Sequence, residues 1–411
     1  MEVRLAYGND GLDLVIPDGV EVDRFGLSAA EKPLSYPEFV DRFQENGGKA
    51  LLAGDPPLIV VNDGHRSTPT LRVLQWLDQY DSELLDRAPF LIACGAHSEP
   101  SPEHLDTIFG PFLDRVRDRL AWHDCRNLDA MVQVGTDHFS EPVFINRLAH
   151  EAAKLFAINS VEPHYFAGYT GGRKSFFPGL TDRATIERNH NLANSLDCAP
   201  LRLTGNPMSE HLDEMLEFMR PDLIFSVQLV VDAGHRIGGI FCGPIREAFS
   251  AAVEESERLY AEPVSELYDL VLAEVRPPLD HALYQIQKGL ENCRAGVRDG
   301  GSIVVVAACQ DGVGKRAFYD LAEQWDQDNN RALDGVARFG SHKLSRVLAM
   351  TKRIGVRLYS ELPEDQPRRV FYEPVANLQN FIEEELGKQN RKRLAIVHDA
   401  GHTVLKPIDT Q

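Results

Sequence analysis

The sequence predicts an α/β protein of two domains, each with a mainly parallel sheet flanked by helices. Strand-like apolar runs alternate with helical patterns: residues 57–63 (PLIVVND) precede the periodic segment 70–80, and residues 89–95 (PFLIACG) precede the helical pattern of residues 102–120. This β-then-α order is typical of parallel sheets with helices on both faces. A chain of 411 residues also exceeds what one hydrophobic core usually supports.

The alternation continues and then restarts after a short linker that the sequence predicts. Further strands are expected at residues 130–135, 155–161 and 222–231, and a helical stretch over residues 244–261 ends this half of the chain. Residues 262–266 (EPVSE) are interpreted as the linker, because a strand, a helix at 283–297 and another strand follow it. We therefore expect an N-terminal domain at residues 1–265 and a C-terminal domain at residues 266–411, whose last residues are expected to pack back on the N-terminal domain.

Composition excludes several classes of protein. The 43% apolar and 26% charged content is that of an average globular protein, and no window approaches the roughly 18 consecutive apolar residues of a membrane span. The net charge of −19 argues against nucleic acid or an anionic membrane as the main partner. The N-terminus has no apolar signal-peptide core, which favours a cytoplasmic protein. The six cysteines include no CxxC pair, so neither a zinc ribbon nor a disulfide framework is indicated.

A glycine-rich segment at residues 161–180, VEPHYFAGYTGGRKSFFPGL, concentrates groups suited to catalysis. Its glycines permit close approach of the backbone to a ligand, and its free amides with the Thr170 and Ser175 hydroxyls could hold an anion. Arg173 adds positive charge and is expected to lower the pKa of the Lys174 amine. The aromatic residues that follow indicate that the loop re-enters the protein. The glycines are Gly168, Gly171 and Gly172.

Polar residues directly follow three of the predicted strands. Asp63 and Arg66 follow the first of these strands, His97 follows the second, and His164 follows the strand that ends at residue 161. Ligands of open α/β sheets bind beyond the carboxyl ends of the strands, so we expect these side chains to meet at one edge of the sheet. With His65 beside Arg66 the set includes three histidines, and three histidines at one edge favour a functional site over three independent core residues.

The segment after Arg66 also predicts a helix start. Ser67, Thr68 and Pro69 are typical of a helix cap and first turn, and such an N-terminus suits a phosphate. Standard cofactor motifs are missing, because no GxGxxG follows a strand and no HExxH occurs.

A zinc-dependent hydrolase or lyase remains open as an alternative. His97, His164 and His190 could share one metal ion, since three imidazoles are a familiar ligand set for zinc.

Five motifs occur in order along nearly the whole chain. With them the chain resembles the nickel-dependent lactate racemases, a family of 2-hydroxyacid racemases and epimerases. The resemblance implies an isomerase that transfers a hydride reversibly between a small 2-hydroxy acid and a nickel-pincer nucleotide, and it implies partner proteins that mature this cofactor. The motifs are YGNDGLDLVIP at residues 7–17, Asp63-x-x-Arg66 followed by Thr68-Pro69, Gly95-x-His97, residues 164–179 with His190 downstream, and Tyr284-Gln285-x-x-Lys288.

The resemblance also implies roles for individual residues in binding the cofactor. Lys174 would tether this group, pyridinium-3,5-bisthiocarboxylic acid mononucleotide nickel, through a thioamide, and His190 would be the protein ligand to nickel. The cofactor phosphate would lie near Asp63, near the start of the following helix and near the glycine loop. The other cofactor contacts would be Ser67, Thr68, Gly171, Gly172 and Arg173.

The catalytic and substrate-binding roles follow from the same resemblance. His97 and His164 would be the acid/base pair, because histidine titrates near neutrality. Arg66 would bind the substrate carboxylate with its planar fork. The N-terminal domain would be the catalytic and cofactor-binding domain, and the C-terminal domain would close a cleft that contains the active site. Its contacts to the substrate would be Tyr284, Gln285 and Lys288.

One departure from the family pattern concerns the substrate. Ser98 and Glu99 follow His97, where an arginine and a proline are usual in the family. The identity of the 2-hydroxy acid is therefore open, and His65 beside Arg66 could recognise an additional polar group. A non-catalytic carrier of the nickel nucleotide is a further alternative, although the presence of both His97 and His164 argues against it.

Overall fold

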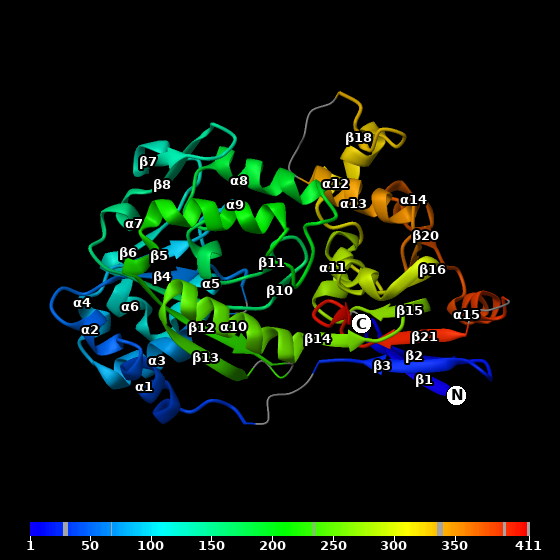
Figure 1. Cartoon of the computed structure of the whole chain (residues 1–411), viewed down its shortest axis with the longest axis horizontal. Helices are drawn as coiled ribbons and strands as arrows, with labels where there is room; N and C mark the ends of the chain where they lie inside the picture. Colours follow the sequence, from blue (N-terminus) through cyan, green and yellow to red (C-terminus); the bar gives the residue numbers. More distant parts are fainter. Residues whose placement is uncertain are drawn as a thin grey trace. The chain divides into compact units, whose positions relative to one another are not determined.

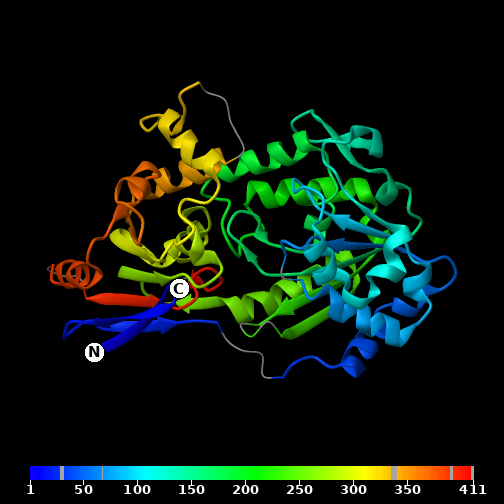
Figure 2. The same cartoon turned by 180° about the vertical axis from the view of Figure 1, so that it is seen from behind.

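The computed structural model of the chain describes residues 1–27, 32–66, 68–232, 234, 236–334, 340–388 and 392–408. The chain forms two compact units, each built around a six-stranded sheet (Figures 1 and 2). The first unit comprises Ser28–His190 and Arg202–Leu259, and the second comprises Met1–Leu27, Asn191–Leu201 and Tyr260–Gln411. The predicted α/β class with mainly parallel sheets and flanking helices is confirmed.

The sheet of the first unit consists of β4 (Leu58–Asn62), β5 (Phe90–Ala93), β6 (Leu120–Trp122), β9 (Leu155–Ser160), β12 (Ile224–Val231) and β13 (Ile237–Pro244). Its strand order is β13-β12-β9-β4-β5-β6, and every pair is parallel except β12 with β13. The central strands are runs of buried residues, as expected for parallel strands with both faces covered.

The helices of the first unit are α1 (Tyr36–Glu45), α2 (Gly48–Leu52), α3 (Thr70–Tyr80), α4 (Leu84–Arg87), α5 (Pro102–Phe109), α6 (Leu113–Val116), α7 (Arg147–Glu151), α8 (Arg183–Asn191), α9 (Pro207–Leu216) and α10 (Ile245–Tyr260). Helices α1 and α3 to α6 bury their apolar side chains against one face of the sheet. Alternate strand residues such as Ile158 and Val227 fill this core. Because side chains alternate between faces, Asn159 and Gln228 point to the opposite face.

The second unit has an all-parallel sheet of order β20-β19-β16-β15-β21-β3. Helices α11 to α13 contribute to the core on one face, and α15 with the β1–β2 hairpin covers the other. The strands are β1 (Glu2–Tyr7), β2 (Asp10–Val15), β3 (Glu21–Phe25), β14 (Ala261–Val264), β15 (Tyr268–Glu274), β16 (Val297–Val306), β17 (Trp325–Asp326), β18 (Arg331–Ala332), β19 (Gly355–Tyr359), β20 (Glu373–Pro374), β21 (Arg393–Val397) and β22 (Val404–Pro407). The helices are α11 (Leu283–Cys293), α12 (Arg316–Leu321), α13 (Ser341–Thr351), α14 (Asp365–Arg369) and α15 (Leu378–Leu386).

Short elements complete the two units. Two hairpins of the first unit are β7 (Met131–Thr136) with β8 (Pro142–Asn146), and β10 (Pro163–His164) with β11 (Gly168–Tyr169). Among the described residues no helix combines the length and the apolar character needed to cross a bilayer. The 3-10 helices are η1 (Gly110–Phe112), η2 (Arg117–Arg119), η3 (Leu128–Ala130), η4 (Gly172–Ser175), η5 (Leu192–Asn194), η6 (Glu217–Met219), η7 (Pro221–Leu223), η8 (Leu279–His281), η9 (Arg294–Gly296) and η10 (Ala322–Gln324).

The division into units differs from the predicted boundary in two places. The chain enters the second unit at Tyr260, close to the boundary expected near residue 265. However, residues 1–27 also belong to the second unit, because β3 adds to its sheet as a parallel neighbour of β21. The segment Asn191–Leu201 joins it as well. Such additions depend on contacts between distant segments, which the local sequence pattern does not reveal.

Two predicted elements also differ from the structure. The strand expected at residues 130–135 is β7, which lies outside the six-stranded sheet and pairs with β8 alone. Half of its residues are partly buried and only the first is fully buried, so it has no core face. The helix expected over residues 102–120 breaks into shorter pieces at Gly110, whose φ of 47° does not continue an α-helix, and at the proline that follows.

Candidate active site

The predicted meeting of three strand ends is found in the first unit. Strands β5, β4 and β9 are neighbours and run parallel, so their carboxyl ends lie at the same edge of the sheet. Asp63 follows β4, His97 follows β5, and His164 follows β9. This edge of the sheet therefore carries the polar residues that were predicted to lie there.

Asp63 and His97 form a hydrogen-bonded pair. His97 Nδ1 lies 2.5 Å from Asp63 Oδ2, and the carboxylate is 5% exposed whereas the imidazole is 41% exposed. Because a carboxylate accepts hydrogen bonds, Nδ1 carries the proton and the lone pair of the neutral ring is on Nε2. The geometry supports a role for Asp63 in orienting His97, and its predicted place near the cofactor phosphate stays a prediction.

Two more imidazoles adjoin this pair. The ring of His65 lies 4.3 Å from that of His97 and 4.5 Å from that of His104, measured between ring centroids. His65 is exposed. Sequence reasoning missed His104, because its place on α5 beside the Asp63 turn depends on helix packing.

The glycine loop is shaped by packing against the sheet and α10. Gly171 and Gly172 have φ of 75° and 50°, which residues with a side chain rarely adopt. A Cβ atom on Gly171 would lie 2.6 Å from Val161 Cγ2, and one on Gly172 would lie 2.6 Å from Phe249 Cδ2. Both positions therefore require glycine for structural reasons alone. The loop re-enters the protein as predicted, since Phe176 and Phe177 are completely buried.

Buried polar side chains beneath the loop hold it in place. Gln228 Oε1 accepts a hydrogen bond from Gly172 N at 3.0 Å, and Gln228 Nε2 donates to Asn159 Oδ1 at 2.8 Å. Asn159 Nδ2 in turn donates to the Ser175 hydroxyl, which donates to Asn62 Oδ1 at 3.1 Å. The amide of Gly172 and the hydroxyl of Ser175, predicted as anion ligands, are thus already engaged by the protein.

Sequence reasoning missed these network residues, although a signal was present. Asn159 and Gln228 are amide residues inside mostly apolar strands, and both are fully buried. A buried amide needs hydrogen-bond partners, so such a residue indicates an organised polar site.

Replacing Gln228 with alanine is expected to destabilise the first unit. The change leaves the Gly172 amide and the Asn159 carbonyl oxygen buried without their partner, and each such loss costs about 1–3 kcal/mol. Thermal unfolding followed by scanning calorimetry should show a lower transition temperature. Alanine at the exposed Gln133 is the matched control and should leave the transition in place. An unchanged transition in the Gln228 variant would contradict the proposed anchoring of the loop.

The predicted helix cap at residues 67–69 is wrong in detail. Helix α3 begins at Thr70, and Pro69 is its N-cap without a side-chain hydrogen bond. The Thr68 hydroxyl lies 2.8 Å from Asn62 Nδ2 and 2.7 Å from Ser160 Oγ, so it belongs to the buried network and is not free to cap. Ser67, predicted as a cofactor contact, lies outside the described residues.

Lys174 offers a buried amine at the centre of the loop. The residue is 9% exposed. Burial lowers the pKa of its amine well below the ordinary value, and the charges of Arg66 and Arg173 lower it further. The expected effect of Arg173 is confirmed, although burial is the larger cause. A neutral amine is nucleophilic, so Lys174 is suited to form a covalent bond with a ligand.

The guanidinium of Arg173 is engaged by protein groups. Its Nε lies 2.8 Å from Asp213 Oδ1, a terminal nitrogen donates to Ser209 Oγ at 2.7 Å, and the group lies 4.8 Å from the centre of the Phe249 ring. Arg173 therefore fastens the loop to α9 and α10. Its predicted contact with a cofactor stays a prediction.

His190 has the tautomer of a metal ligand. Its Nδ1 lies 2.8 Å from the carbonyl oxygen of Ile186, which only accepts, so Nδ1 carries the proton and the lone pair of the neutral ring is on Nε2. Burial, with a further contribution from the charge of Lys174, lowers the pKa of His190 to about 4. The ring is therefore neutral at pH 7, as binding to a metal ion requires.

His164 ends strand β10 of the short β10–β11 hairpin and is partly buried. Its Nδ1 accepts hydrogen bonds from the backbone amides of Phe166, at 3.2 Å, and of Ala167, at 3.1 Å. The protein thus contacts Nδ1 in both rings. In His97 a carboxylate accepts a hydrogen bond from this atom, whereas in His164 two backbone amides donate to it.

The arrangement of possible metal ligands does not favour the zinc alternative. Within the described residues, two groups of three side chains have ligand atoms within 4.8 Å of one another, and neither contains His164 or His190. One group is Asp63, His65 and His97, and the other is His138, His211 and Glu214.

The second of these groups is a hydrogen-bonded network of the protein. His211 Nδ1 accepts from Asn189 Nδ2 at 3.2 Å, and His211 Nε2 lies 3.2 Å from Asp137 Oδ2. Both nitrogens of His211 are therefore already used. The network ties α9 to α8, the helix that carries His190.

The predicted substrate residues of the C-terminal half lie on α11 of the second unit. Tyr284 and Lys288 are partly buried, whereas Gln285 is exposed. Lys343 of α13, which sequence reasoning missed, donates to the carbonyl oxygen of Tyr284 at 2.8 Å and lies 4.0 Å from the centre of its ring. Burial, aided by the charge of Lys288, lowers the pKa of Lys343 to about 7. The predicted substrate contacts and the predicted cleft stay predictions.

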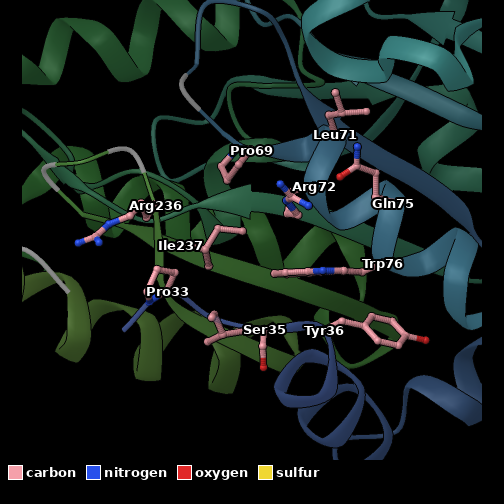
Figure 3. A pocket seen from close by; sticks show the side chains of 11 residues that line it. Pro33, Ser35, Tyr36, Pro69, Leu71, Arg72, Gln75, Trp76, Arg236 and Ile237 are labelled. Carbon is pink, nitrogen blue, oxygen red and sulfur yellow. The ribbon is translucent and has the colours of Figure 1, made fainter. Parts of the chain in front are cut away.

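A separate pocket of about 650 Å³ opens beside α1 and α3 of the first unit, as Figure 3 shows. Arg72, Gln75 and Trp76 of α3 line it together with Tyr36 and Arg236. None of the residues predicted to bind the cofactor or the substrate lines this pocket. It is therefore distinct from the site at the strand ends.

Comparisons with known proteins identify chains that are similar to this one. Residues 7–198 match the lactate racemase N-terminal domain, and residues 269–345 match the lactate racemase C-terminal domain. The chain is 30% identical over 337 residues to the lactate racemase of Thermoanaerobacterium thermosaccharolyticum, covering 77% of this chain and 76% of that protein. It is 29% identical over 294 residues to the lactate racemase of Lactiplantibacillus plantarum, covering 70% and 68% of the two chains.

Two solved structures share the fold. The lactate racemase apoprotein from Thermoanaerobacterium thermosaccharolyticum superimposes with a TM-score of 0.81 at 23% identity, covering 99% of this chain and 100% of that one. A protein from Thermotoga maritima gives a TM-score of 0.68 at 19% identity, covering 93% and 100%.

Proposed function

Since the chain belongs to the lactate racemase family and is an isomerase, we propose that it racemises or epimerises a small 2-hydroxy acid by reversible hydride transfer to a nickel-pincer nucleotide. The observation that carries the proposal is the combination, in one unit, of a buried amine at Lys174 and a metal-ready imidazole at His190. Neither feature is needed by a protein that only binds a small acid.

The residues present fit the proposed cofactor. A thioamide forms only from an unprotonated amine, and burial keeps the pKa of the Lys174 amine low. His190 presents Nε2 as the ligand atom, with Nδ1 held by the Ile186 carbonyl oxygen. Lys174 would therefore hold the cofactor and His190 its nickel. When bound, the nickel-pincer nucleotide supplies a reversible acceptor for the hydride on C2 of the substrate.

The chain itself has to handle the hydroxyl proton and the carboxylate. His97, held by Asp63 with its lone pair on Nε2, is suited to accept the proton of the substrate hydroxyl. His164 is its proposed partner, and Arg66 binds the carboxylate. The residues Tyr284, Gln285 and Lys288 are proposed to contact the same substrate. Cofactor-maturation proteins are the proposed partners of the chain.

The test is to follow the optical purity of single enantiomers of 2-hydroxy acids with protein produced in a host that makes the nickel nucleotide. We expect at least one acid of a panel to lose optical purity, and the panel should include acids with polar side chains because Ser98, Glu99 and His65 adjoin the site. If the cofactor is bound and no acid reacts, the chain is a carrier of the nucleotide and the proposal fails.

Arg66→Lys is expected to lower kcat/KM by about one to two orders of magnitude. A guanidinium binds a carboxylate through two hydrogen bonds, whereas an ammonium offers a point charge, and a charged hydrogen bond contributes about 1.5–3 kcal/mol. The measurement compares kcat/KM with wild type. Arg72→Lys, a change on the neighbouring helix α3, serves as the control. An Arg66 variant with wild-type kcat/KM would show that another group binds the carboxylate.

A further inference from the structure

The two histidines of the proposed pair are set in opposite tautomers. Asp63 accepts from His97 Nδ1 at 2.5 Å, which leaves the lone pair of His97 on Nε2. The amides of Phe166 and Ala167 donate to His164 Nδ1 at 3.2 and 3.1 Å. An amide N–H only donates, so Nδ1 of His164 carries the lone pair and Nε2 carries the proton of the neutral ring.

This difference decides which ring accepts a proton first. A histidine that takes a proton at Nε2 needs a lone pair there and a proton on Nδ1. His97 meets this condition, whereas a proton on Nδ1 of His164 would face two amide hydrogens. His164 can therefore donate a hydrogen bond from Nε2 but cannot act as a base while the amides hold it.

The turn that supplies the two amides is firmly built. It connects β10 to β11, and Phe166 and Ala167 are both buried. Asn206, the fully buried N-cap of α9, donates from Nδ2 to the Phe166 carbonyl oxygen at 2.8 Å. Its Oδ1 accepts from Ser209 N at 3.2 Å, so the same side chain caps α9 and anchors the turn.

We propose that this turn, residues 165–167 anchored by Asn206, locks His164 in the Nε2–H tautomer, so that the pair begins catalysis as one proton acceptor, His97, and one hydrogen-bond donor, His164. Asn206 is thereby a positioning residue. The catalytic meaning of the lock rests on the proposed function, whereas the tautomers themselves do not.

The proton step then differs between the two enantiomers. For the enantiomer whose hydroxyl reaches His97, the O–H bond breaks and the proton forms a bond with His97 Nε2. The nickel-pincer nucleotide, which Lys174 and His190 would hold, would supply the acceptor for the C2 hydride, so that the substrate becomes a 2-oxo acid. His164 donates to a substrate oxygen from Nε2. For the other enantiomer, His164 accepts the hydroxyl proton only after the amides of Phe166 and Ala167 no longer donate to its Nδ1.

The direct test reads the tautomers by long-range ¹H–¹⁵N NMR in cofactor-free protein labelled with ¹⁵N-histidine. His97→Gln and His164→Gln assign the two rings. We expect the proton on Nε2 in His164 and on Nδ1 in His97. A proton on Nδ1 of His164, in the neutral or the charged ring, would overturn the proposal. The NMR result does not depend on racemase activity. A failure of the proposed function and a failure of the tautomer lock can therefore be distinguished.

A matched pair of variants tests the anchor. Asn206→Asp keeps the oxygen that caps α9 but loses the donor to Phe166, so His164 should shift toward a mixture of tautomers while His97 stays unchanged. Asn377→Asp, at the N-cap of α15 in the second unit, should change neither ring. An unchanged His164 in the Asn206 variant would overturn the role of Asn206.

Discussion

Replacing His97 with alanine is expected to reduce racemisation by about 10²–10⁴-fold, the usual contribution of a general acid or base. The imidazole is the proposed proton acceptor, and its 2.5 Å hydrogen bond to the buried Asp63 orients the lone pair of Nε2. With alanine in its place, nothing at this position takes the hydroxyl proton as the hydride leaves. The measurement is the rate at which a single enantiomer of the substrate loses optical purity.

The control for this variant is alanine at His150, an exposed histidine on α7. It should racemise at the wild-type rate. The His97 variant should also retain the mass of the bound cofactor, because His97 is not proposed to hold it. Racemisation at more than about a tenth of the wild-type rate would mean that another group is the base.

Replacing Lys174 with alanine is expected to remove the covalently bound cofactor completely. The pKa of the Lys174 amine is lowered mainly by burial and then by Arg66 and Arg173, which favours the unprotonated form that a thioamide requires. Protein purified from a host that makes the nickel nucleotide should show a mass increment in wild type that the variant lacks. Racemisation should fall with it.

Two further variants sharpen this test. Lys174→Arg keeps a long side chain that ends in nitrogen, but a guanidinium stays protonated in proteins and cannot form the thioamide, so the increment should again be absent. Lys49→Ala, at an exposed lysine of α2, should keep the increment. An increment that persists without Lys174 would refute the tether, whether or not nickel remains at His190.

The fold was predictable wherever the local pattern alternates clearly. The runs that became β4, β5, β9 and β12 are largely apolar segments between helical patterns, and all four lie in the parallel part of one sheet. The strand β7 was misplaced because a short apolar run does not reveal its partner. The place of β3 beside β21 depends on pairing between the two ends of the chain, which hydrophobic periodicity does not reveal.

The candidate site was likewise predictable in part. Asp63, His97 and Lys174 were predictable because they follow strands or lie in a glycine-rich motif. The hydrogen bond between Asp63 and His97 was not, since it joins residues of two different loops. Asn206 carried no recognisable signal beyond a helix cap, because its contact with Phe166 arises from the packing of α9 against the hairpin.

Hydride transfer at C2 can be tested by following the fate of that hydrogen. An enantiomerically pure 2-hydroxy acid that carries deuterium at C2 is racemised in ordinary water by the cofactor-loaded enzyme, and the product of opposite configuration is analysed by mass spectrometry. Hydride transfer to a bound acceptor and back predicts that this product keeps its deuterium. Full replacement of the deuterium by solvent hydrogen would show that a base removes the C2 hydrogen as a proton, and it would contradict the account.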